Sequence, residues 1–123
     1  MLALSIALTV LLLLESLPSA VAGLVRSRAG ITRLDRLTRL GLPEGRKLYV
    51  ASLLGAWHLA GSAAVIAGIR VPAAGVAGGA LEAAVFGWVL SRQLRHGDRG
   101  RVLSAYCLFT ALALAVLIVD ALR

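Results

Sequence analysis

The feature that most constrains this chain is a series of four long apolar segments. They cover residues 2–24, 48–69, 72–90 and 102–122. A helix rises about 1.5 Å per residue and the hydrocarbon layer of a bilayer is about 30 Å thick, so each segment is long enough to cross it. The sequence therefore predicts an all-α fold, an integral membrane four-helix bundle that forms one domain over residues 1–123.

Composition agrees with a membrane domain and argues against other classes. The chain has 123 residues, of which 59% are hydrophobic, and the four segments leave no room for a soluble catalytic domain. A net charge of +7 would suggest nucleic acid in a soluble protein. Here the basic residues flank the apolar segments, which points to lipid phosphates instead. The lipid bilayer is therefore the expected partner, and nucleic acid is not.

The basic residues also predict an orientation. Of the 13 side-chain cations, 11 lie in the first and third connections: Arg26, Arg28, Arg33, Arg36, Arg39, Arg46, Lys47, Arg92, Arg95, Arg99 and Arg101. The other two are Arg70 and Arg123. The positive-inside rule makes these two connections cytoplasmic, so both termini are expected outside the cell membrane. Tyr49, Trp88 and Tyr106 fall near the cytoplasmic ends of their segments, as in an interfacial aromatic belt.

The first apolar segment is expected to remain in the protein as a span. Small residues at 19–22 offer a spacing similar to a cleavage site, but no basic region precedes the segment and its apolar run exceeds that of a usual signal peptide. Pro18 interrupts the run and predicts a bend about one turn earlier. Two readings of the bend are open: an ordinary change of direction, or a widened cavity beside Glu15.

Residues 31–40 have the pattern of a short amphipathic helix. Leucine and isoleucine fill one half of the helical wheel, and arginine, aspartate and threonine cover most of the other half. Gly30 precedes the segment, and residues 41–43, GLP, end it. We expect the helix to lie in the inner headgroup layer, with a docking surface for a partner as the alternative.

Small residues recur every fourth position in the third span, at Gly75, Gly79, Ala83 and Gly87. Such a stripe lets two helix backbones approach closely, which is a main packing device in lipid. The stripe predicts packing within the bundle, and homodimerisation is the other interpretation. The connection at residues 70–72 is very short, so the second and third spans are expected to be antiparallel neighbours.

Three ionisable residues, Glu15, His58 and Glu82, fall within about a helical turn of mid-membrane depth. A charge at that depth is costly, so we expect the three side chains to form a buried polar cluster inside the bundle. Two carboxyl groups and an imidazole in a site of low dielectric could share protons. A hydrogen-bond network that only ties helices together is the alternative, and Asp120 and His96 are expected to be solvated.

The motifs of other functional sites are not found. His-x-x-His, Glu-x-x-His and paired-cysteine spacings are missing, so no metal ligand is assigned. The lone Cys107 is expected to be a packing residue. No phosphate loop or nucleophile elbow appears, and no catalytic residue or cofactor is predicted.

Two segments of the sequence resemble the DoxX-like family of small four-helix membrane proteins. Residues 37–43 read LTRLGLP before a span rich in glycine and alanine, and residues 61–72 read GSAAVIAGIRVP before a similar third span that closes on LRHGD at 94–98. Many family members carry a glycine and a lysine near the end of the first span, whereas residues 14–18 of this chain read LESLP and contain neither. The resemblance implies an accessory or subunit-type protein, because some members are similar to the membrane subunit of a quinone-linked sulfur-oxidising enzyme. A membrane redox protein or a second copy of the chain is then the expected protein partner.

A small proton-coupled multidrug transporter is the alternative function. Transporters of that kind also have four spans and a glutamate in the first, as Glu15 is here. They have short loops, weak charge bias and an aromatic-rich chamber, whereas this chain has a long basic first connection and few aromatic residues.

Overall fold

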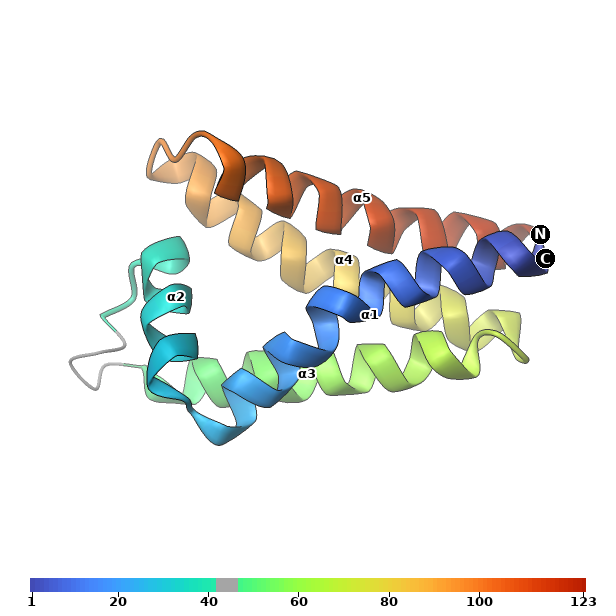
Figure 1. Ribbon diagram of the computed structural model, residues 1–123, viewed down its shortest axis with the longest axis horizontal. Coiled ribbons are helices and arrows are strands. Elements are labelled where there is room, and N and C mark those ends of the chain that lie inside the picture. Colours follow the sequence, from blue (N-terminus) through green and yellow to red (C-terminus); the bar gives the residue numbers. More distant parts are fainter. Residues whose placement is uncertain (42–46) are drawn as a thin grey trace.

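In the computed structural model, which describes residues 1–41 and 47–123, the described residues form helices joined by short connections (Figure 1). This confirms the all-α prediction for the described part of the chain. Leu42, Pro43 and Arg46, on which parts of the family resemblance and the charge pattern rest, lie outside it. The helices are α1 (Leu2–Val25), α2 (Arg28–Thr38), α3 (Leu48–Ala67), α4 (Pro72–Arg95) and α5 (Arg101–Leu122).

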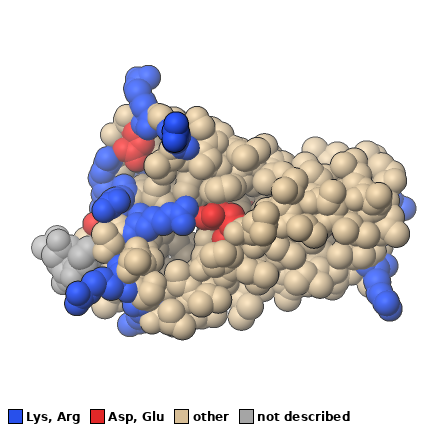
Figure 2. Space-filling model, in the orientation of Figure 1, with Lys and Arg blue, Asp and Glu red and all other residues tan. Residues whose placement is uncertain are grey.

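The helices α1, α3, α4 and α5 are long and apolar enough to cross a membrane. They form a ring in which α1 packs against α3 and α5, and α4 packs against the same two helices. Figure 1 shows the two chain termini and the connection between α3 and α4 at one end of the bundle, and α2 at the other. Lys and Arg side chains gather at the end with α2 (Figure 2).

The helix α2 begins three residues earlier than the predicted segment because Ser27 caps it. The Ser27 hydroxyl accepts a hydrogen bond from the Gly30 amide at 3.1 Å, which satisfies one of the free donors of the first turn. At the other end the Thr38 carbonyl accepts two hydrogen bonds from the Arg92 guanidinium of α4, at 3.1 and 2.7 Å. These hydrogen bonds hold the C-terminal end of α2 against α4.

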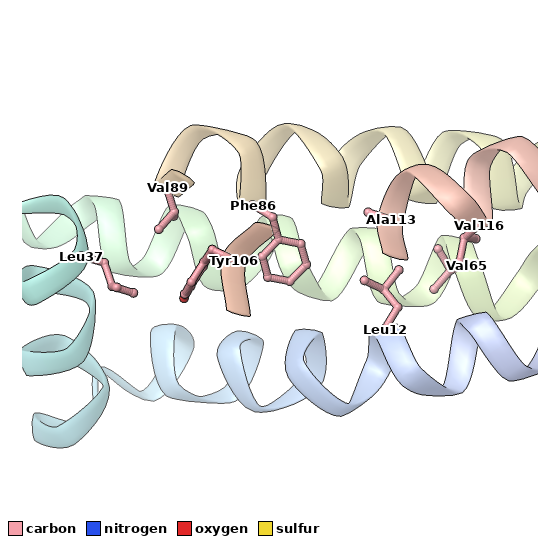
Figure 3. Packing of buried hydrophobic residues seen from close by; sticks show 8 residues of the cluster. All are labelled: Leu12, Leu37, Val65, Phe86, Val89, Tyr106, Ala113 and Val116. Atoms are coloured by element: carbon pink, nitrogen blue, oxygen red, sulfur yellow. The ribbon is translucent and has the colours of Figure 1, made fainter. Parts of the chain in front are cut away.

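The hydrophobic core runs along the bundle axis between all five helices (Figure 3). Phe86 and Tyr106 stand at its centre with their rings 6.0 Å apart, and Phe109 packs against both. Tyr106 is only 6% exposed, so its prediction as an interfacial belt residue is wrong. The α5 face that carries Tyr106 turns inward instead. The core is completed by Leu12, Leu37, Val65, Val89, Ala113 and Val116.

The small residues of α4 serve close packing within the bundle along most of the predicted stripe. A Cβ atom added at Gly79 would lie 2.9 Å from the Ala113 carbonyl of α5, and one at Gly75 would collide with Asp120 of the same helix. Ala83 packs against the core. The stripe ends there, because a Cβ atom at Gly87 would meet nothing within 4 Å among the described residues.

Candidate functional site

The candidate site is a buried pair of titratable side chains, Glu82 of α4 and His58 of α3. The Glu82 side chain is fully buried, and its Oε2 lies 2.8 Å from His58 Nδ1. A short hairpin joins α3 to α4, so the two residues reach the same depth from opposite sides of the turn. With Nδ1 protonated, the imidazole donates to the carboxylate.

Two serines complete the hydrogen bonds of the carboxylate. Ser16 of α1 donates to Glu82 Oε1, and Ser62 of α3 lies 3.5 Å from the same oxygen. The two hydroxyls are 2.7 Å apart and bond to each other. We call Ser16, His58, Ser62 and Glu82 the polar cluster. It joins α1, α3 and α4, and every member is buried, so its bonds form out of contact with lipid.

Two residues packed around the polar cluster, Gly61 and Phe86, fix the space that it occupies. A Cβ atom at Gly61 would lie 2.6 Å from Glu82 Oε1, so the glycine is what leaves room for the carboxylate between α3 and α4. The ring of Phe86 lies 4.9 Å from the His58 ring and separates the imidazole from the rest of the core. The pair is therefore held in a fixed position between helix backbones and an aromatic wall.

The structure places Glu15 away from this cluster. Its carboxylate accepts hydrogen bonds from Arg33 of α2 at 3.2 Å and from Ser19 at 3.3 Å. Glu15 is next to Ser16 in the chain, and consecutive helical residues point about 100° apart. Of the three predicted residues, His58 and Glu82 are therefore brought together, while Glu15 forms a partly exposed ion pair nearer the end that carries α2.

A cavity of about 310 Å³ lies beside the cluster. Its lining comes mainly from α1, α2 and α3, and it includes His58 and Arg33. Pro18, which lies inside α1, also lines it. Because Nδ1 of His58 is bonded to Glu82, Nε2 is the ring nitrogen left without a hydrogen bond among the described residues.

A second polar group lies at the end of the bundle that carries the termini. Asp120 of α5 accepts a hydrogen bond from Ser5 of α1 at 2.6 Å and pairs with Arg123 at 3.0 Å. The Arg123 guanidinium also donates to the carbonyls of Gly68 and Ile69 at the end of α3. Asp120 is 2% exposed, so the prediction that it is solvated is wrong. This group connects α1, α3 and α5.

The serine members of the polar cluster were not found by sequence reasoning, although the sequence contains a signal for one of them. The buried polar residues of α1 are Ser5, Thr9 and Ser16, which stand four and seven positions apart. That spacing marks one face of a helix. The helical face of α1 therefore predicts Ser16 as a member of the polar cluster, whereas depth in the span alone predicts Glu15.

No family model, curated protein or solved structure matches the chain. The geometry of the polar cluster and of its cavity therefore carries the functional interpretation. In the described part of the chain, no group of three or more His, Cys, Asp or Glu side chains is arranged to hold a metal ion.

Proposed function

We propose that this chain is a DoxX-like multi-pass protein of the cell membrane that works as an accessory subunit of a membrane redox system. The observation that carries the proposal is the His58–Glu82 pair, buried inside the bundle and in contact with a cavity through the imidazole. Ionisable residues inside spans are costly and are most often kept for a function. The resemblance at residues 37–43 and 61–72 supplies the redox assignment.

The pair has chemistry that a redox system in a membrane needs. A lipid-soluble electron carrier that gains electrons also gains protons, which must be delivered away from bulk water. An imidazole bonded to a carboxylate can pass a proton from Nε2 and recover it with help from the carboxylate. In this proposal His58 exchanges the proton, and Glu82 holds the imidazole in position through its hydrogen bond to Nδ1.

The basic end of the molecule supports a cytoplasmic position for α2 and for the connection between α4 and α5 (Figure 2). Both termini, which lie at the opposite end (Figure 1), would then face outward. Alkaline phosphatase fused after Arg123 is expected to be active, because that enzyme matures only after export. A fusion within α2 is the control and should be inactive; the reverse pattern would overturn the orientation.

The proton-coupled transporter has weaker support. In that reading Glu15 binds a cationic substrate, but its carboxylate is engaged by Arg33 and Ser19. A cation would have to displace the Arg33 guanidinium first. Proton-driven uptake of a cationic dye into liposomes that contain only this chain would nevertheless favour the transporter over the subunit.

The subunit proposal is tested by purification from the native membrane in mild detergent. A redox enzyme is expected to co-purify in fixed ratio with the tagged chain and to lose most of its activity in a Glu82→Gln variant. Glu15→Gln, the same change outside the polar cluster, is the matched control and should leave activity intact. Elution of the chain alone, or equal activity of the complex with all three sequences, would refute the proposal.

A further inference from the structure

We propose that the cavity between α1, α2 and α3 binds a small, electrically neutral, apolar molecule that carries one carbonyl or hydroxyl oxygen. This goes beyond the proposed function, because the site is complete within this chain and needs no redox partner. The inference rests on three observations: the size of the cavity, the free hydrogen-bonding groups at its inner side, and the pairing of the charges around it.

The cavity has the size and walls of a small-molecule site. Its volume, about 310 Å³, is at the lower end of the roughly 300–1,000 Å³ range in which proteins hold such ligands. Leu34, Leu37, Leu54 and Val89 provide apolar lining from three helices. Small residues at the crossing of α1 with α3, such as Gly23, contribute to the lining without filling the space. An apolar body is therefore the part of a ligand that these walls accept.

Two polar atoms are available to the ligand. His58 Nε2 is the nitrogen that Glu82 leaves free, and the His58 side chain keeps 8% of its surface exposed. Tyr106 also lines the cavity, and within residues 1–41 and 47–123 its hydroxyl has no hydrogen bond. Figure 3 shows this hydroxyl directed toward the side of Leu37, away from Phe86. A carbonyl or hydroxyl oxygen could accept from the Tyr106 hydroxyl, and a hydroxyl could also donate to Nε2 of the neutral imidazole.

The charges around the cavity favour a neutral ligand. Arg33 and His58 are the lining residues that can carry charge, and each has a carboxylate partner, Glu15 at 3.2 Å and Glu82 at 2.8 Å. An anionic ligand would have to compete with these carboxylates, and a cationic one would meet the Arg33 guanidinium. A neutral molecule leaves both pairs intact and avoids the cost of breaking the buried His58–Glu82 pair.

Benzophenone is a suitable probe because it is neutral, apolar, carries one carbonyl oxygen and forms a covalent bond to nearby C–H groups on irradiation. The purified chain, in nanodiscs of phosphatidylcholine, is irradiated with increasing benzophenone, and the adducts are mapped by mass spectrometry. We expect labelling of cavity residues such as Leu34 and Leu54 to saturate. Labelling of lipid-facing residues such as Leu114 should increase in proportion to concentration, which makes them an internal reference.

Variants separate a specific site from partition into lipid. Tyr106→Phe removes one hydrogen bond and keeps the ring, so the half-saturating concentration should rise about three- to tenfold. Tyr49→Phe is the matched control on an exposed part of α3 and should change nothing. Leu34→Trp fills the cavity from α2 and should abolish the saturable labelling, while the proportional labelling of Leu114 remains.

Labelling of the cavity that never saturates, or that is unchanged in both Tyr106→Phe and Leu34→Trp, would overturn the proposal. Saturation at the same benzophenone concentration in Tyr106→Phe and in the parent would show that the Tyr106 hydroxyl does not bond to the ligand. None of these results depends on co-purification of a redox enzyme, so this inference and the proposed function can fail independently.

Discussion

Replacing His58 with leucine is expected to destabilise the bundle by about 3–5 kcal/mol, because Glu82 then keeps a buried carboxylate without its partner. The loss should appear as a lower midpoint when the chain is titrated with sodium dodecyl sulfate in mixed micelles. The remaining donors, Ser16 and Ser62, bond to one oxygen of the carboxylate and cannot replace the imidazole at Oε2.

A double variant and a matched pair test the cause of this loss. If the unpaired carboxylate is responsible, combining His58→Leu with Glu82→Leu should recover much of the stability. Arg33→Leu also removes the cationic partner of a glutamate, but the Arg33 side chain is 58% exposed, so the cost there should be about 0–1 kcal/mol. Equal losses in His58→Leu and Arg33→Leu would show that burial of the pair does not matter.

Replacing Arg123 with alanine is expected to cost about 3 kcal/mol, at the lower end of the range for a broken buried pair. The change removes the partner of the buried Asp120 and the donors to the carbonyls of Gly68 and Ile69. Arg70→Ala is the control, because Arg70 lies at the same end of the bundle and is exposed. The detergent titration midpoint should fall for Arg123→Ala and stay unchanged for Arg70→Ala.

A second substitution tests whether the unpaired Asp120 carboxylate causes the loss of stability in Arg123→Ala. Asp120→Asn keeps the shape of the side chain and removes its charge, so Arg123→Ala should cost less in an Asp120→Asn background than alone. Additive losses would mean that Arg123 acts through the α3 carbonyls, independently of Asp120.

The spans could be predicted from the sequence because length and hydropathy decide them. The depth of His58 and Glu82 followed from counting residues on either side of a short turn, and the two side chains are hydrogen-bonded in the structure. Glu15 was predicted at the same depth, but helical rotation directs Ser16, and not its neighbour Glu15, toward the bundle axis. The depth of a side chain depends on its position along the span. The direction in which it points depends on which neighbouring helices its own helix packs against.

The burial of Asp120 and of Tyr106 could not be read from their positions near span ends. Asp120 is covered because Gly68 and Gly75 let α3 and α4 approach it, and these glycines come from other parts of the sequence. Tyr106 is covered because Leu37 of α2 joins the same core. The cavity likewise depends on where α2 folds back over α1 and α3, which the amphipathic pattern of α2 does not specify.

The attachments of α2 differ in kind from those of the spans beneath it. Leu37 lies in the core, and the Thr38 carbonyl accepts two hydrogen bonds from Arg92, so the C-terminal end of α2 is held inside the bundle. The ion pairs Arg33–Glu15 and Arg39–Asp98 lie at the surface instead, where dissolved ions compete for them. Salt is therefore expected to weaken the surface ion pairs of the helix that lines the cavity, while the spans stay folded. The ionic strength of the medium would then influence how often the His58 imidazole is exposed to solution.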